Sequence, residues 1–266
     1  MLRGGVNRIS QFRQLVILGA AFAIVTPLSV VPVVAEDAAA EMVVGIHDVE
    51  LAEGADAGEF EKYVKEKLAP AWIKPRDGMR VVVLKGDRGK RKDKYQLAFV
   101  FDSIETRNKF FPAEGAGGSE AYQAAMQPVA EVMEGLSKFI AQEDGPYTDY
   151  VALGGSVKPA EGGPPAYGVH DFDLREGVDT TKFEAMVREE FAPVWKESDN
   201  GLRFGISKGD RGDRKGKYQL VYIFDSIEDR DKFFPSEDGG ATDAFEEVMQ
   251  RKGDVMQKLA SHLGQR

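Results

Sequence analysis

The sequence predicts an α+β protein made of two copies of one β-α-β-β-α-β unit, the second lacking its last strand, packed sheet to sheet. Nearly the same sequence occurs twice at a constant offset of 123 residues: Ile46-His47-Asp48 returns as Val169-His170-Asp171, and Lys85–Gly89 returns as Lys208–Gly212. Within each copy the apolar residues change between helical and strand periodicity in the same order. Some strands are apolar on both faces, which is typical of strands covered on both sides. A repeat of this length is a whole small domain, so both halves must share one fold.

Length and composition set the limits of this prediction. The 266 residues fit two domains of roughly 100–150 residues each. The chain has no cysteine, so no disulfide supports the fold and each half needs a packed core. The formal net charge of −9 argues against binding to nucleic acid or to an anionic lipid surface.

Residues 1–35 are predicted to be a secretory signal peptide. Three arginines precede an apolar run from Leu15 to Ala35 that contains no acidic residue and ends in Val33-Val34-Ala35. This pattern predicts cleavage after Ala35 and an exported protein, periplasmic or secreted, with no stable membrane insertion after cleavage. The alternative is an uncleaved anchor, because the run is long enough to span a bilayer.

Each copy opens with an apolar strand, predicted at 43–51 and at 166–174, and continues with an amphipathic helix. Asp56, with Glu59 three residues later, is expected to cap the first of these helices. Pro70 and Pro193 should end or kink the two helices just before a tryptophan. The apolar stripe consists of Phe60, Val64, Leu68 and Trp72 and, in the second copy, Phe183, Val187, Phe191 and Trp195.

A strand pair and a second helical region complete the unit. Strands are predicted at 80–85 and 94–101, joined by a glycine-rich turn over 86–93. A capped helix begins at 102–105, and one long helix is predicted over about 119–140. A fourth strand is expected at 149–153. We define repeat 1 as 42–153, the Gly/Pro linker as 154–165, and repeat 2 as 166–266.

Repeat 2 has no counterpart of the fourth strand, which would recur at about 272–276, beyond Arg266. Two interpretations stay open. A neighbouring segment covers the bare edge of the sheet, or the edge pairs with another chain, since unpaired strand edges invite strand addition. The second interpretation predicts self-association through repeat 2.

This order of elements is the ferredoxin-like split unit. The chain resembles the dimeric α/β-barrel superfamily through the strand Val44–His47, the following hairpin, and the helix entry Phe101–Glu105. In that family two sheets pack face to face into a barrel, usually from two chains. The resemblance therefore implies a family dimer fused into one chain as an intramolecular pseudo-dimer barrel. Relatives include haem enzymes, cofactor-free monooxygenases and stress proteins, so it implies no single activity.

His47 and His170 are the best catalytic candidates, because they are the imidazoles within the repeated core. They could act as a general base or as a ligand beside the sheet, or they could be half-buried structural histidines. Asp48 should lie on the opposite face from His47, since strand neighbours alternate. The axial histidine of haem relatives usually lies outside the first strand. The remaining histidine, His262, has Phe139 as its counterpart in repeat 1.

The basic hairpin turns offer a weaker candidate site. Lys85, Arg88, Lys208 and Arg211 could hold an anion together with glycine N–H groups, or could be solvated turn residues. The turns lack the Gly-Lys-Ser/Thr ending of a Walker loop. No spacing in the sequence suggests a metal site.

The leading functional prediction is an exported small-molecule-binding or stress-type protein, whose function does not require catalytic activity. The first alternative is a cofactor-free or haem-dependent monooxygenase-like enzyme, and the second is a structural or assembly protein. The cofactor is left open, with haem as one option. A ligand between sheet and helices, or at the barrel seam, would be lined by aromatic side chains. These are Tyr95, Phe99, Phe101, Tyr218, Tyr222 and Phe224.

Overall fold

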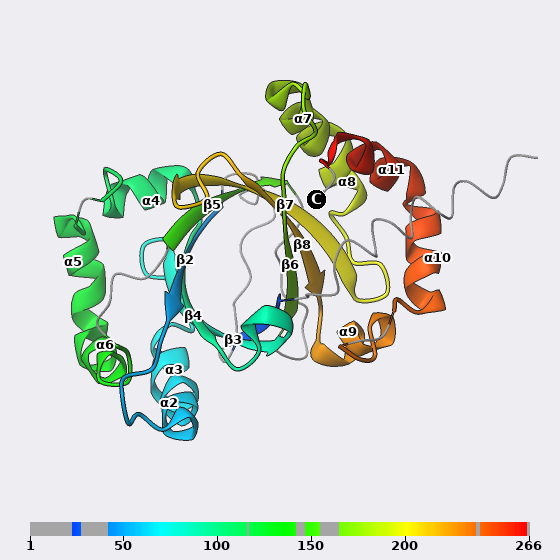
Figure 1. Cartoon of the computed structure of the whole chain (residues 1–266). Helices are drawn as coiled ribbons and strands as arrows, with labels where there is room; N and C mark the ends of the chain where they lie inside the picture. The colour runs from blue at the N-terminus through cyan, green and yellow to red at the C-terminus, as the bar shows by residue number, and fades with distance from the viewer. Residues whose placement is uncertain are drawn as a thin grey trace, which may run out of the picture.

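The computed structural model shows a curled antiparallel sheet with helices outside it in two groups (Figure 1). The structure describes residues 23–27, 42–115, 117–141, 147–154, 165–237 and 240–264. The expected mixed α+β class is confirmed. Apart from 23–27, the predicted leader lies outside the described residues, as does the predicted linker apart from its two ends.

Seven strands, β2 to β8, form the curled sheet, and β1 pairs with both of its edges to close a barrel in the order β1-β3-β4-β2-β5-β7-β8-β6. Every pairing is antiparallel. The strands are β1 (Ala23–Pro27), β2 (Val43–Val49), β3 (Met79–Arg88), β4 (Tyr95–Phe101), β5 (Tyr147–Gly154), β6 (Ala166–Phe172), β7 (Leu202–Gly212) and β8 (Tyr218–Phe224).

The α-helices and the π-helices follow the strands in the same order in both repeats. Repeat 1 contains α2 (Ala57–Tyr63), η1 (Val64–Leu68), α3 (Ala69–Ala71), η2 (Gly89–Arg91), α4 (Ile104–Phe110), α5 (Glu120–Met126), η3 (Gln127–Val129) and α6 (Ala130–Ser137). Repeat 2 contains α7 (Thr180–Met186), η4 (Val187–Phe191), α8 (Ala192–Val194), α9 (Ile227–Phe233), α10 (Asp243–Arg251) and α11 (Gly253–His262).

The first helix of repeat 1 begins and ends where the sequence predicts. The Asp56 side chain accepts a hydrogen bond from the Glu59 N–H, and the helix ends just before Trp72. The sequence did not predict that the turn before Pro70 widens into a π-helix, in which the Ala69 N–H donates to the Val64 carbonyl. Proline lacks an N–H for the usual bond, and the same widening occurs before Pro193.

The predicted long helix over 119–140 is wrong in one respect. It is two helices, α5 and α6, separated by the short 3₁₀ turn η3. Pro128 lies in that turn, and proline cannot continue an α-helix because it lacks an N–H and its ring clashes with the preceding turn. The sheet strands also run further than predicted: β3 continues through Gly86 to Arg88.

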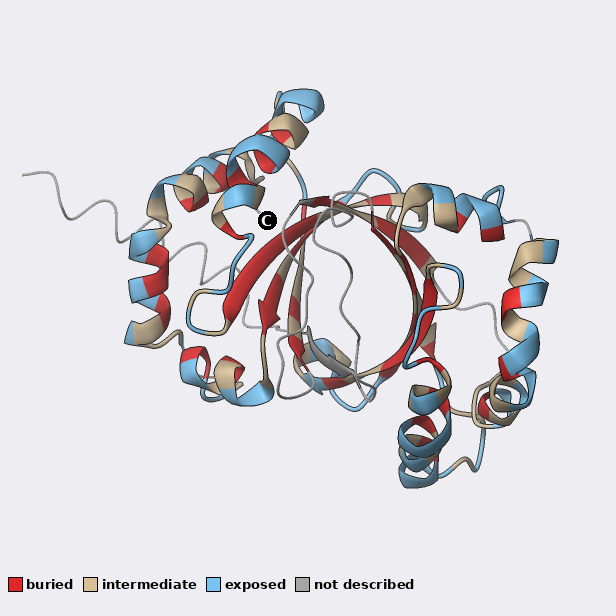
Figure 2. Cartoon of the chain, turned by 180° about the vertical axis from the view of Figure 1, so that it is seen from behind, coloured by how far each residue is buried: buried red, intermediate tan, exposed pale blue. Residues whose placement is uncertain are grey.

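The two faces of the sheet have different partners. On the outer face of repeat 1, Phe60, Val64, Leu68 and Trp72 pack against the strands, with no side chain more than 2% exposed. On the inner face Val82, Ala98 and Val100 form a separate cluster. Figure 2 shows the same division, with buried residues on the strands and on the sheet-facing sides of the helices. Functional side chains can therefore lie either under the helices or inside the barrel.

Candidate functional site

His47 lies in the middle of β2 on the outer, helix-facing side of the sheet. Its ring stacks on Tyr147 of β5, with ring centroids 5.3 Å apart and planes 13° from parallel. The edge of Phe99 on β4 contacts it, with centroids 5.7 Å apart. These three side chains are only half-buried. The sheet therefore holds an imidazole between two aromatic rings that solvent can still reach.

The aromatic surface continues from Phe99 towards the helices. Phe111, just after α4, contacts Phe99 at 6.4 Å between centroids, and Tyr122 of α5 contacts Phe111 at 4.9 Å. Both rings are half-buried. We call the residues Tyr147, His47, Phe99, Phe111 and Tyr122 the His47 surface. Flat aromatic molecules pack well against such a surface, because offset and edge-on ring pairs are favourable.

A buried ion pair lies next to His47. Asp149, two residues after Tyr147 on β5, accepts a hydrogen bond of 2.6 Å from Arg107 of α4, whose side chain is 2% exposed. Gly45 makes room for this carboxylate, since a Cβ at that position would lie 2.7 Å from Asp149 Oδ1. Tyr147, Asp149 and Arg107 are not among the site residues predicted from the sequence. One signal was available: Arg107 interrupts an apolar helix face, and Arg230 repeats the interruption.

Burial favours the neutral form of the His47 imidazole. Burial lowers the pKa of His47, while the negative charges of Asp149 and Asp48 oppose the shift without reversing it. Within the described residues, neither ring nitrogen has a protein hydrogen-bond partner. Asp48 lies on the inner face, as predicted, where Arg91 and Gln96 donate to it. A neutral imidazole with an accessible nitrogen can accept a proton from a bound molecule.

The equivalent surface in repeat 2 is filled. Phe204 stands where repeat 1 has Val81, and its ring contacts Tyr222 at 4.4 Å and Trp195 at 4.5 Å. Tyr222 is 4% exposed, whereas its counterpart Phe99 is half-buried. Three further residues of repeat 2 are buried although their counterparts in repeat 1 are half-buried: Phe234, Phe245 and Met249. The two predicted histidines therefore lie in different surroundings, and only His47 has a partly open aromatic surface.

The other predicted ring residues pack in the cores under the helices. Tyr95 and Tyr218 donate hydrogen bonds to Glu61 and Glu184 respectively. The remaining predicted residues, Phe101, Tyr222 and Phe224, are at most 4% exposed. Of the six predicted ring residues, Phe99 is the one that the structure places beside His47.

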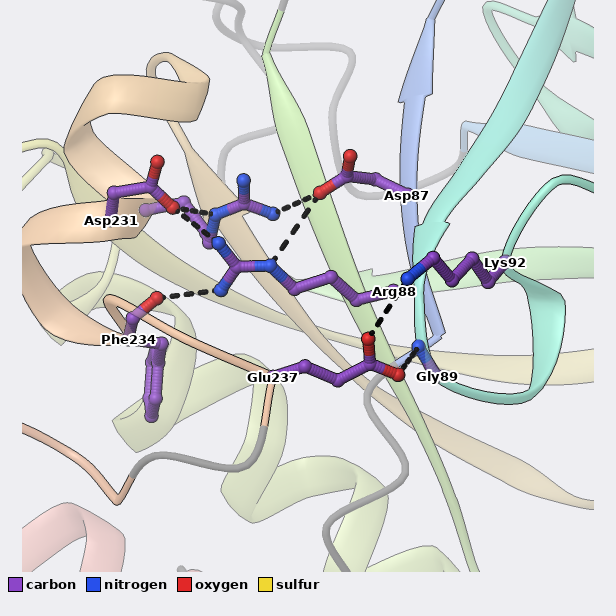
Figure 3. Close-up of polar contacts among 8 residues, drawn as sticks. Asp87, Arg88, Gly89, Lys92, Asp231, Phe234 and Glu237 are labelled. Atoms are coloured by element: carbon purple, nitrogen blue, oxygen red, sulfur yellow. Dashed lines mark hydrogen bonds and ion pairs between the residues drawn. The ribbon is translucent and has the colours of Figure 1, made fainter.

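The predicted anion-binding residues make contacts within the chain. Lys85 and Lys208 pair with Glu61 and Glu184. Figure 3 shows Arg88 of repeat 1 donating to Asp231 and to the Phe234 carbonyl of repeat 2, both at 2.7 Å. At the equivalent position Arg211 of repeat 2 donates at 2.8 Å to Asn108 and to the Phe111 carbonyl of repeat 1.

The glycines that follow these arginines also form hydrogen bonds with the other repeat. The Gly89 N–H donates to Glu237, and the Gly212 N–H donates to Glu114. Both glycines have a positive φ, which glycine adopts without strain. These hydrogen bonds are the first cause of the lowered pKa of each glutamate. Each hairpin tip therefore docks on the other repeat.

The described residues hold no group of three or more acidic or histidine side chains that could bind a metal ion. No helix among them has the length and apolar content to cross a membrane. His262 lies at the end of α11, where its Nδ1 is 2.7 Å from the Lys258 carbonyl.

Comparisons with known proteins give structural likeness only. No family model matches the chain, and no curated protein matches it. Among solved structures it is similar to a proposed monooxygenase from Lactobacillus acidophilus, with 12% identity, 85% of this chain and 90% of that chain covered, and a TM-score of 0.49. It is also similar to a proposed monooxygenase from Fusobacterium nucleatum, with 11% identity, 81% and 88% covered, and a TM-score of 0.43. An anthrone oxidase-like protein has 11% identity, 88% and 91% covered, and a TM-score of 0.44. Similarity at this level implies nothing about the reaction of this chain.

Proposed function

We propose that repeat 1 binds a flat aromatic molecule at the His47 surface and that His47 accepts a proton from it. The observation that carries the proposal is the position of the His47 imidazole between the half-buried rings of Tyr147 and Phe99, where burial lowers its pKa. Ring stacking would supply binding, and the ring nitrogen would supply the chemistry. The enzyme alternative among the sequence predictions therefore fits these residues better than a protein that binds without reacting.

The reaction class that fits this site is cofactor-free oxygenation. A C–H bond of the aromatic substrate breaks, its proton goes to His47, and the electron pair stays on the substrate as a stabilised carbanion. Dioxygen then oxidises that carbanion, so that the former CH2 carbon becomes a carbonyl and the second oxygen atom leaves as hydroxide with the remaining hydrogen. The hydroxide takes the proton held by His47 and becomes water, which returns His47 to its neutral form.

Haem does not fit the His47 surface. A metal-ligating histidine almost always donates its second ring N–H to a carboxylate or carbonyl, which fixes the ring. Within the described residues His47 has no such partner, and the Asp149 carboxylate on the neighbouring strand is engaged by Arg107. No step of the proposed reaction uses haem.

We further propose that the two repeats form an intramolecular pseudo-dimer. The reciprocal docking of the hairpin tips supports this, because each contact of repeat 1 on repeat 2 has a counterpart 123 residues away in the opposite direction. Such exchange of the same contacts is the signature of a two-fold interface. The basic leader pattern likewise supports the proposal that the protein is exported.

Anthrone is a suitable probe, because it is flat and carries an acidic CH2 group between two rings. Calorimetric titration of the full chain should show saturable binding, and Tyr147→Ala should weaken it about tenfold through loss of ring stacking. In air, oxygen uptake should accompany conversion to the quinone. Binding without oxygen uptake would favour the non-catalytic prediction, and no binding would refute the site.

A further inference from the structure

In the structure β6 of repeat 2 pairs along one edge with β1, which comes from the N-terminal segment. β1 pairs with β6 through Ala23–Val25 and with β3 through Ile24–Pro27. It thus lies between one strand of each repeat, and the barrel closes through it.

β1 stands in the same register as β5. In repeat 1, Asp149 of β5 lies opposite Gly45 of β2 and opposite Arg211 of β7. Ile24 lies opposite Gly168 and Arg88, which are the residues 123 positions away from those two partners.

The irregularities of pairing also coincide. The register of β5 shifts between Asp149 and Tyr150, and the register of β1 shifts at the equivalent place, between Ile24 and Val25. The facing glycines behave alike: a Cβ at Gly86 would clash with the Arg91 carbonyl oxygen at 1.6 Å, and one at Gly209 with the Arg214 carbonyl oxygen at 2.0 Å. β3 and β7 therefore pair with β1 and β5 respectively through the same irregularity of register.

We propose that residues 23–27 are the fourth strand of repeat 2 and stay bound between β3 and β6 in the folded protein. Without a strand there, backbone groups of Leu84–Arg88 and Tyr167–Val169 would lose their ladder partners, which is costly for a closed sheet. The sequence Ile24-Val25-Thr26 is β-branched throughout and favours a strand. This proposal conflicts with the predicted loss of residues 1–35, because cleavage after Ala35 would detach the strand from the rest of the chain.

Engineered disulfides in the full chain test the register, and the chain has no cysteine of its own to interfere. Ala23 and Val169 are partners across the β1–β6 pair. The double variant Ala23→Cys/Val169→Cys should oxidise to one intramolecular disulfide, since paired strand residues lie within bridging distance. The shifted control, Ile24→Cys/Val169→Cys, should not, because neighbouring strand positions face opposite sides. Equal cross-linking in both, or none in either, would overturn the register.

Hydrogen exchange gives a second test that needs no new bond. Val25→Pro should speed amide exchange in 84–88 and 167–169 about tenfold or more, because proline removes an N–H from the ladder. The control Val31→Pro alters the same segment outside β1 and should leave those amides protected. Equal protection in both variants would overturn the proposal. Exported protein that begins at residue 36 and still protects these amides would also overturn it.

Discussion

His47 and Tyr147 are cross-strand neighbours on β2 and β5 whose rings lie 5.3 Å apart and nearly parallel. This pair places a titratable ring nitrogen on a partly open aromatic surface. In repeat 2, by contrast, His170 contacts Tyr222, whose ring is covered by Phe204. The two histidines therefore lie in different surroundings: His47 is beside partly exposed rings, whereas the ring beside His170 is buried.

The first prediction exchanges the residues that distinguish the two surfaces. Phe204→Val should uncover Tyr222 and create a second aromatic surface in repeat 2, at a cost of about 2–4 kcal/mol in the free energy of unfolding. Val81→Phe should cover Phe99 and abolish anthrone binding, at about 1–3 kcal/mol. Calorimetric titration measures the number of sites and denaturant unfolding measures the cost. Unchanged binding by Val81→Phe would place the ligand elsewhere.

The second prediction concerns the pKa of His47, which should lie below the usual 6.5. The unfolded chain then binds a proton more readily, so stability should fall as pH decreases from 6.5 through the folded pKa. Asp149→Asn should lower the pKa further, because Asp149 raises it. NMR titration of the His47 ring measures both values, with His47→Gln assigning the signal. A higher pKa in Asp149→Asn would contradict this account of the charges.

The third prediction concerns Arg107, which bonds Asp149 at 2.6 Å and Asp210 at 2.5 Å. Arg107→Met should destabilise the protein by about 3–5 kcal/mol, because it leaves the Asp149 carboxylate largely buried without its cation. The control Lys138→Met removes the exposed pair with Glu134 and should cost at most about 0.5 kcal/mol. Denaturant unfolding measures the loss of stability in each variant. Similar losses in the two variants would show that burial of the ion pair does not determine its contribution to stability.

The fourth prediction concerns stability in acid. Burial by itself would raise the pKa of Glu61, but hydrogen bonds from Lys85 and Tyr95 outweigh it and lower the pKa; Glu184 behaves alike. Their contribution to stability is present above pH 4.5 and is lost as pH falls through the folded pKa. Glu61→Gln/Glu184→Gln should therefore be less stable at pH 7 and should lose less stability between pH 5 and pH 3. A parallel decline in both proteins would contradict this.

The periodicity of the sequence predicts the order of strands and helices well, because both repeats alternate between two-residue and near-four-residue spacing. The ends of elements were harder to predict: Pro128 breaks the predicted helix, and β3 continues past Gly86 to Arg88. The contacts of the hairpin arginines with the other repeat could not be predicted either, because hairpin turns that face solvent and hairpin turns that pack on protein have the same composition. Only tertiary pairing reveals that Arg88 reaches Asp231.

The proposed site overlaps the residues predicted from the sequence in part. His47 and Phe99 were candidates because they are repeated and lie on strands. Tyr147 and Asp149 could not be identified, because their importance comes from pairing with β2 across a sequence separation of about one hundred residues. The difference between the repeats arises from Val81 and Phe204, both ordinary core residues in sequence terms.

The most direct measurement is deuterium incorporation into the CH2 group of anthrone, followed by NMR under nitrogen in D2O. Proton transfer to His47 predicts catalysed exchange, lowered about 10²–10⁴-fold by His47→Gln with little change in anthrone binding, and left unchanged by the matched control His170→Gln. Equal exchange rates for His47→Gln and His170→Gln would contradict the account.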